Sequence, residues 1–274
     1  MEITALIENE MGKCSELKNE FGLSLYIKDV DIELIFDTGK SGEFTVNADK
    51  LGIDLKNIEH VVLSHSHFDH TGGMRALIEK YNKNFTLHIS RTFFEEKHRI
   101  TELVHEFLGN NFDEKYILDN KIKIDYIADD ETKLSKNITL FTNFKQLVDF
   151  ETPVRYYFRK IYDDYILDNM EDEIIIAAET SKGLVLICGC SHIGIVNIIE
   201  NIKRRTGKKI YGIIGGLHLT KASDERIEKV MRYFTESEIE FFGVSHCTGE
   251  KAVNILKSSG KKFIQVNTGT KIVF

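Results

Sequence analysis

The stretch HVVLSHSHFDHTGG, residues 60–73, carries the strongest signal for the fold. Its first five residues predict a buried strand, and residues 73–81 have the apolar spacing of a helix. Four potential metal ligands stand between these two elements: His65, His67, Asp69 and His70. His65 and His67 are two residues apart, so in an extended segment they face the same side and can share one metal. Asp69 and His70 follow where the chain turns, and can bind an adjacent metal.

A surface loop that carries histidines by chance is the alternative. Four potential ligands within six residues, directly after an apolar strand, argue against it. Imidazole together with carboxylate suits Zn, Fe or Mn, and Gly72-Gly73 lets the helix start close to the site. The stretch therefore predicts a metal site at a strand–helix junction.

Outside this stretch, short strands and helices alternate. Strands are predicted at Ile3–Glu8, Leu23–Lys28, Ile32–Phe36, Phe85–Ile89, Ile122–Ile127, Ile138–Thr142, Ile174–Glu179, Leu184–Cys188, Lys209–Ile214, Glu240–Val244, Phe263–Val266 and Lys271–Phe274. Helices are predicted near Phe93–Leu108 and at Ile195–Arg205, Asp224–Phe234 (with Ser223 as N-cap) and Glu250–Ser258. Residues 91–172 are poorly patterned and end in an acidic run, so we expect them to lie partly outside the core sheet. The alternation in both halves predicts two sheets with helices outside.

Composition narrows the class of protein. The chain has 274 residues, 42% of them hydrophobic, and 36 basic against 43 acidic residues give a net charge of −7. We therefore expect a globular protein that does not coat nucleic acid. Apolar runs are too short to span a bilayer, and the N-terminus does not resemble a signal peptide. We expect a cytoplasmic, single-domain protein over 1–274, whose cysteines are reduced thiols: Cys14, Cys188, Cys190 and Cys247.

HSHFDH followed by Thr71-Gly72-Gly73 resembles the HxHxDH signature of the metallo-β-lactamase superfamily. Phe36-Asp37-Thr38-Gly39 is similar to the first motif of that superfamily, in which Asp37 would orient a metal-bound histidine. The resemblance implies an α/β fold of the αββα four-layer sandwich type in one domain, with residues 91–172 as a lid or insert.

Three further histidines each follow a predicted strand, in the strings GCSH, GGLH and HCTG. These strings resemble a branch that includes the dihydropterin synthase-like proteins of methanopterin biosynthesis. The resemblance implies one metal held by His65, His67 and His192, and a second held by Asp69, His70 and His246. Cys190 stands where the superfamily usually has a bridging Asp, so it is a soft ligand, a residue beside the ligands or a packed thiol. His218 is a catalytic proton donor, a further ligand or a structural histidine.

Two metals would supply a hydroxide nucleophile, with Asp69 holding one metal and orienting the water. The implied activity is that of a hydrolase, or of a transferase that handles phosphoesters or diphosphates, including a dihydropterin-diphosphate condensing enzyme. Zinc is the expected metal, with iron or manganese as alternatives. A diiron oxidoreductase on the same fold is the competing hypothesis, although such relatives usually have Glu at the position of His67. A degenerate scaffold is a third, against which the intact HSHFDH counts.

Arg155, in the string TPVR, is expected to bind a phosphate or carboxylate through its two-pronged guanidinium. The expected partner is a small anionic or phosphorylated molecule, with no nucleic acid and no membrane. The sequence leaves the exact substrate and the oligomeric state open.

Overall fold

The computed structural model describes residues 1–81 and 83–274. They form two compact units. Unit 1 comprises Met1–Ala128, Val154–Asp172 and Asn267–Phe274, and unit 2 comprises Asp129–Pro153 and Glu173–Val266. None of the helices formed by the described residues combines the length and the apolar character that a membrane span requires.

Unit 1 is built on a seven-stranded sheet. Its strands are β1 (Glu2–Ile7), β2 (Ser24–Lys28), β3 (Glu33–Phe36), β4 (His60–Val62), β5 (Thr86–Ser90), β8 (Lys123–Ile127) and β18 (Lys271–Val273). They lie in the order β18-β1-β2-β3-β4-β5-β8, antiparallel as far as β3 and parallel from β3 onward. This arrangement places the residues that follow β3 and β4 at one edge of the sheet.

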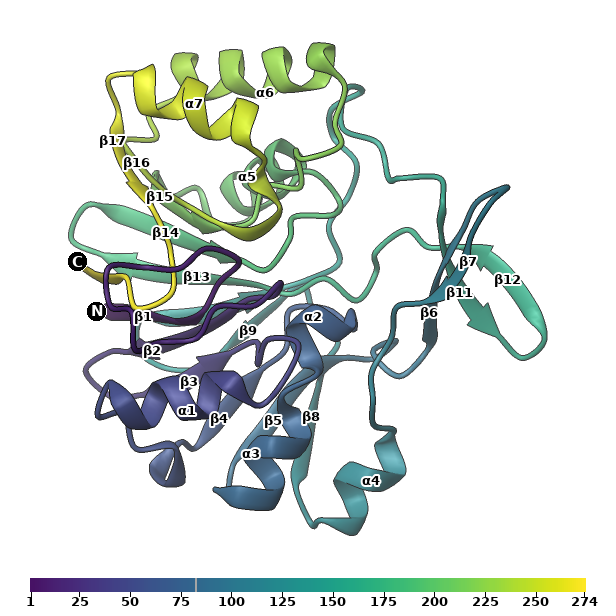
Figure 1. Ribbon diagram of the computed structural model, residues 1–274. Coiled ribbons are helices and arrows are strands. Elements are labelled where there is room, and N and C mark those ends of the chain that lie inside the picture. The colour runs from purple at the N-terminus through teal and green to yellow at the C-terminus, as the bar shows by residue number, and fades with distance from the viewer. Residues whose placement is uncertain (82) are drawn as a thin grey trace. The chain divides into compact units, whose positions relative to one another are not determined.

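Short helices pack on this sheet (Figure 1). They are α1 (Glu43–Lys50), η1 (Leu55–Asn57), α2 (Phe68–Thr71), α3 (Met74–Lys80) and α4 (Glu114–Asp119). Phe44 of α1, Leu77 of α3 and Ile117 of α4 lie fully buried in one core with Leu87 of β5. Burying such side chains removes apolar surface from water and holds the strand–helix junctions in place.

A second, four-stranded sheet in unit 1 corrects one prediction. No helix forms near Phe93–Leu108. Instead, β6 (Glu96–Ile100) and β7 (His105–Phe107) form a hairpin. The sheet is completed by β11 (Tyr157–Ile161) and β12 (Asp164–Leu167), in the order β12-β11-β6-β7. The helix prediction was wrong because β6 pairs with β11, from some sixty residues further along the chain, and local spacing cannot report such a partner.

Unit 2 is built on another seven-stranded sheet. Its strands are β9 (Glu131–Lys133), β10 (Ile138–Phe141), β13 (Ile175–Thr180), β14 (Gly183–Cys188), β15 (Ile210–Gly215), β16 (Phe241–Val244) and β17 (Lys262–Gln265). They lie in the order β17-β16-β15-β14-β13-β10-β9. The predicted hairpin is present as β13 and β14, and β14 through β17 are parallel.

Three helices cover one face of the unit 2 sheet (Figure 1). They are α5 (Ile195–Thr206), α6 (Asp224–Glu236) and α7 (Glu250–Ser258), and the short η2 (His246–Thr248) precedes α7. Ser223 is the N-cap of α6, as predicted, and accepts a hydrogen bond from the Arg226 amide at 3.2 Å. Ile198, Phe234 and Leu256, one from each helix, are buried against the strands. The predicted mixed α/β class with more than one sheet is confirmed.

Candidate metal centre

The histidine-rich stretch lies where the chain leaves β4 and enters α2. His67 has an extended backbone immediately before α2, and Asp69 and His70 belong to that helix. Nε2 of His65 lies 3.1 Å from Nδ1 of His67, and Nε2 of His70 lies 3.6 Å from an oxygen of Asp69. The rings of His65 and His70 are 4.3 Å apart, centre to centre. The structure thus brings the four predicted ligands of this stretch together.

This donor set fits a divalent metal. Two ligands on a tetrahedral zinc, each about 2.0–2.1 Å from the metal, lie roughly 3.3–3.4 Å apart. The separations of 3.1 Å and 3.6 Å in the stretch bracket that value. Neutral imidazoles and one carboxylate also form a donor set that zinc, iron and manganese accept.

Asp37 fixes the orientation of His70. Asp37 directly follows β3 and has a φ of 61°. It accepts hydrogen bonds from the backbone amide and the hydroxyl of Ser64, at 2.7 Å and 2.8 Å, and lies 2.7 Å from Nδ1 of His70. A carboxylate can only accept here, so His70 donates from Nδ1 to Asp37, and its Nε2 is left facing Asp69. Ser64 also lies 2.9 Å from Nδ1 of His65.

A buried cluster of one lysine and two aspartates contacts the histidine-rich stretch through Ser66. Lys97 of β6 lies 2.8 Å from Asp168 and 3.1 Å from Asp172, and all three side chains are at most 2% exposed. Asp172 accepts hydrogen bonds from the amide and hydroxyl of Ser66, which stands between His65 and His67. Burial alone would lower the pKa of Lys97, but Asp172 and Asp168 raise it above its ordinary value.

The sequence did not reveal this cluster. Lys97 fell in a segment predicted to be helical, and its two partners belong to the acidic run of a region expected to lie partly outside the core sheet. Ser64 was missed as well, although its place next to His65 was the one available signal.

His67 is buried inside the protein. This burial lowers the pKa of the His67 ring to about 4, so the ring is neutral at physiological pH.

In unit 2, the three remaining histidine strings follow the parallel strands β14, β15 and β16. Parallel strands place their carboxyl ends at one edge of the sheet, so the loops after them are neighbours. Three residues of these loops, one from each, have positive φ angles: Ser191 (62°), His218 (52°) and His246 (52°). Such backbone strain in non-glycine residues is frequent at functional sites.

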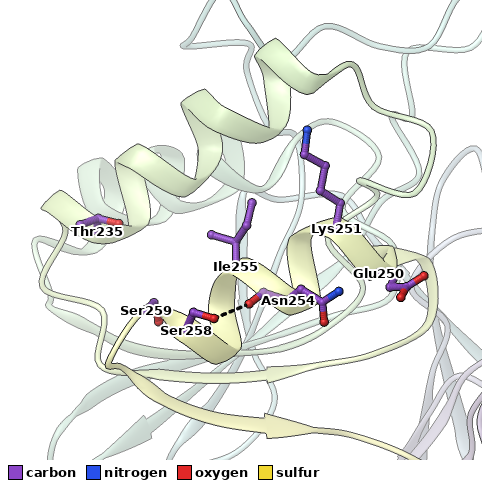
Figure 2. Close-up of a pocket in the computed structure, with 7 residues that line it drawn as sticks. All are labelled: Thr235, Glu250, Lys251, Asn254, Ile255, Ser258 and Ser259. Carbon is purple, nitrogen blue, oxygen red and sulfur yellow. Dashed lines mark hydrogen bonds between the residues drawn. The ribbon is translucent and has the colours of Figure 1, made fainter.

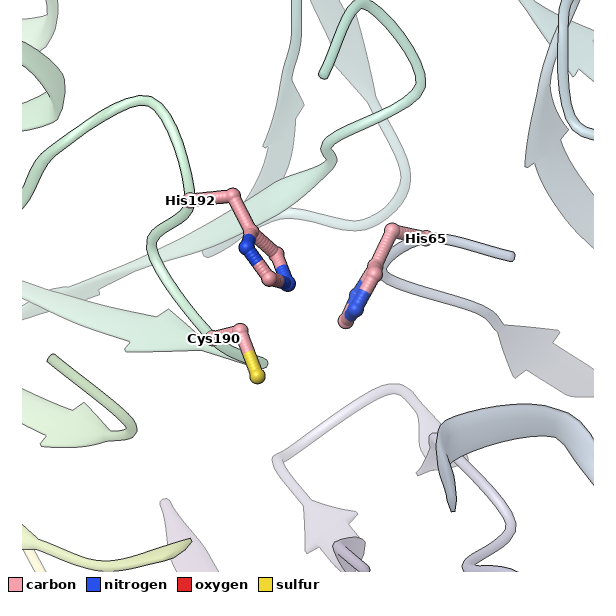
Figure 3. A group of neighbouring side chains, drawn as sticks. All are labelled: His65, Cys190 and His192. Atoms are coloured by element: carbon pink, nitrogen blue, oxygen red, sulfur yellow. The ribbon is translucent and has the colours of Figure 1, made fainter. Parts of the chain in front are cut away.

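The side chains in these loops form a second group. One ligand atom from each of Cys190, His218 and Cys247 lies within 4.8 Å of the other two. The ring of His192 is 4.1 Å from that of His218, centre to centre. Cys190 and His192 leave the loop after β14 toward the same side, as Figure 3 shows, and the figure also draws His65.

Two thiols of unit 2 differ in their surroundings. Burial raises the pKa of Cys188, inside the core, to about 12. Burial would also raise the pKa of Cys247, but hydrogen bonding with Cys190 and His218 holds it well below the ordinary value.

Glu173 holds the loop after β14, a role that the sequence did not predict. Its carboxylate accepts hydrogen bonds from the backbone amides of His192 and Ile193, at 2.7 Å and 3.0 Å.

Arg155 lies in the turn before β11, in unit 1, and is exposed to solvent.

Unit 2 has a cavity of about 710 Å³. It is lined by residues of α6 and α7 and the turn that follows (Figure 2): Thr235, Glu250, Lys251, Asn254, Ile255, Ser258 and Ser259. Its lining holds no histidine and no cysteine, so the predicted chemistry does not belong to it.

Comparison with known proteins agrees with this geometry. Residues 18–127 match the model of the metallo-beta-lactamase superfamily. A crystal structure described as a metal-dependent hydrolase of the beta-lactamase superfamily is 30% identical, with a TM-score of 0.86, and the match covers 100% of this chain and 99% of that one. The chain belongs to the metallo-β-lactamase superfamily. The predicted family and the metallo-β-lactamase type of fold are thereby confirmed.

Two further proteins are similar to this chain. The 7,8-dihydropterin-6-methyl-4-(beta-D-ribofuranosyl)-aminobenzene-5'-phosphate synthase of Methanocaldococcus jannaschii is 29% identical over 287 aligned positions, which cover 100% of this chain and 97% of the synthase. Zn(2+)-bound PqqB from Methylobacterium extorquens matches at a TM-score of 0.58 and 12% identity, over 100% of both chains, and shows the shared fold.

Proposed function

We propose that this protein is a metal-dependent hydrolase, or a transferase that handles phosphoester or diphosphate groups. The observation that carries the proposal is the arrangement of His70, whose Nδ1 is held by Asp37 and whose Nε2 faces the carboxylate of Asp69. A histidine oriented in this way by a carboxylate is a typical metal ligand. Family membership supports the same conclusion, because the most similar solved structure reported above is described as a metal-dependent hydrolase.

The proposed ligands are those predicted from the sequence. His65, His67 and His192 would hold one metal, and Asp69, His70 and His246 a second, with zinc as the expected ion. Bound divalent ions lower the pKa of water and polarise phosphoryl and carbonyl oxygens. Asp37 and Ser64 hold the ring orientations of His70 and His65. Neutral His67 is ready to bind a cation without first losing a proton.

Condensation of a dihydropterin diphosphate with an arylamine ribofuranosyl phosphate is the finer proposal. It is supported by the full-length similarity to the synthase of Methanocaldococcus jannaschii and by the strings GCSH, GGLH and HCTG. A small phosphorylated substrate is expected in either case.

Metal removal tests this proposal. The protein is purified without added metal, its metal content is measured, and the metals are then removed with a chelator. Activity on a phosphodiester, a thioester, a lactone and a pterin diphosphate with its arylamine partner should vanish with the metals and return with zinc. Iron in the purified protein together with oxygen consumption would instead support the oxidoreductase. A metal-free protein with full hydrolytic activity would contradict the proposal.

Arg155→Ala should raise the KM for a phosphorylated substrate about tenfold or more, because hydrogen bonds to charged groups contribute about 1.5–3 kcal/mol. Metal content should not change. Arg204→Ala, at an exposed arginine of α5, is the matched control. Steady-state kinetics with phosphorylated and unphosphorylated substrates measure the effect, and equal KM values in the variant and the wild type would make Arg155 an ordinary surface residue.

A further inference from the structure

A cluster of two thiols and one imidazole lies at the parallel-strand edge of unit 2. Cys190 follows β14, His218 follows β15 and Cys247 follows β16, so each residue comes from a different loop. One ligand atom from each lies within 4.8 Å of the other two. None of the three is among the six ligands proposed above, and unit 2 supplies all of them. Cys190 stands at the border of the two sets, because its sulfur also lies within 4.8 Å of a ligand atom of His192 and of one of His246.

The spacing of these atoms is close to that of a closed metal site. Zinc binds thiolate sulfur at about 2.3 Å and imidazole nitrogen at about 2.0–2.1 Å, so ligand atoms on one tetrahedral ion lie roughly 3.5–3.8 Å apart. The upper limit of 4.8 Å in the cluster exceeds that by about 1 Å. Rotation of the Cys190, His218 and Cys247 side chains can close such a difference without moving the backbone.

Backbone contacts hold the three loops in register. The Gly216 amide donates to the Gly189 carbonyl at 3.1 Å, which joins the loops after β14 and β15. The Leu219 amide donates to the Cys247 carbonyl at 3.0 Å, which joins the loops after β15 and β16. A Cβ at Gly216 would stand 2.5 Å from the sulfur of Cys247, so glycine is needed there for the thiol to reach its position. A site held before binding loses little entropy when the metal enters.

We propose that Cys190, His218 and Cys247 form a three-ligand site for a soft divalent cation such as Zn²⁺. Two thiolates and one imidazole select zinc-like metals over magnesium or manganese, which prefer oxygen ligands. Three protein ligands leave a fourth position on a tetrahedral ion for a water or a ligand molecule. His218 acts in this site as a ligand rather than as a proton donor, and Cys190 and Cys247 are ligands rather than packed thiols.

Cadmium titration of the reduced, metal-free protein tests the site, because thiolate-to-cadmium charge transfer absorbs in the near ultraviolet. The wild type should develop this band with one bound equivalent. Cys190→Ser and Cys247→Ser should each weaken the band. Each of the single variants Cys190→Ser, Cys247→Ser and His218→Ala should reduce cadmium affinity more than the roughly 10–100-fold lost when a residue that only orients a metal ligand is replaced. Cys188→Ala, a thiol in the core, and Cys14→Ser, an exposed thiol, are matched controls that should keep both band and affinity. Circular dichroism and thermal unfolding confirm that each variant is folded.

A second arm separates this site from the proposed catalytic metals. His65→Ala/His67→Ala should lose the metal of the proposed catalytic centre together with hydrolytic activity, and should retain the cadmium band. Absence of the band in the folded wild type would overturn the soft-metal site, whether or not the protein is a hydrolase. Loss of the band in His65→Ala/His67→Ala would also overturn it, because the thiols would then belong to the other metal centre. An intact band in a wild type that shows no metal-dependent activity would support the soft-metal site and contradict the proposed function.

Discussion

Asp69→Asn should lower kcat/KM by roughly a hundredfold or more. Asparagine has nearly the shape of aspartate, so α2 is preserved while the negative charge is removed. That charge stands 3.6 Å from His70 Nε2 and is the one carboxylate among the four clustered donors of the histidine-rich stretch. Disturbing a catalytic metal costs several kcal/mol of transition-state stabilisation, and about 2.7 kcal/mol corresponds to a hundredfold in rate.

The measurement is kcat/KM together with the metal content of each variant. Asp119→Asn, at an exposed carboxylate at the end of α4, is the matched control and should behave as the wild type. Reduced metal content in Asp69→Asn would assign the loss of activity to metal binding. An Asp69→Asn variant with full metal content and wild-type kcat/KM would remove Asp69 from the mechanism.

Lys97→Met should lower the free energy of unfolding by about 3–5 kcal/mol, because removing one partner of a buried ion pair leaves the other uncompensated. Lys97 contacts Asp168 and Asp172, and methionine would keep the volume of the side chain and lose the charge. Denaturant unfolding at pH 7 measures the difference. Lys115→Met, which breaks an exposed pair with Asp119, is the control and should leave the free energy of unfolding close to that of the wild type.

The effect of Lys97→Met should shrink as the pH falls. Burial would raise the pKa of Asp172, but the charge of Lys97 holds it below its ordinary value in the folded protein. A lowered carboxylate pKa stabilises the fold above the pKa of the unfolded chain, and that stabilisation is lost as pH falls through the folded value. Without Lys97 the carboxylates would take up protons more readily, so acid should narrow the gap between variant and wild type.

A triple variant separates charge from packing. Lys97→Met with Asp168→Asn and Asp172→Asn removes all three charges, and should recover a large part of the lost stability because no uncompensated ion remains. Equal stability of Lys97→Met and the wild type at pH 7 would show that the cluster does not contribute as described.

The local sequence determined the class of the fold and indicated the types of metal ligand. The second half of the chain was predicted closely, and α7 was predicted at Glu250–Ser258, as observed, because each of its elements carries its own apolar period and its own end signals. HSHFDH indicated the ligand types without any knowledge of distant residues, since all its donors lie within one short stretch.

The tertiary structure decided what depends on partners distant in the sequence. The segment around Lys97 became a strand because β11 pairs with it, and its ammonium group found Asp168 and Asp172 more than seventy residues away. Cys190 and Cys247 are likewise far apart in the sequence, and become neighbours because β14, β15 and β16 run parallel and end at the same edge. Hydrophobic periodicity records which face of an element is buried. It does not record which other element covers that face, because that choice is made by the packing of the whole chain.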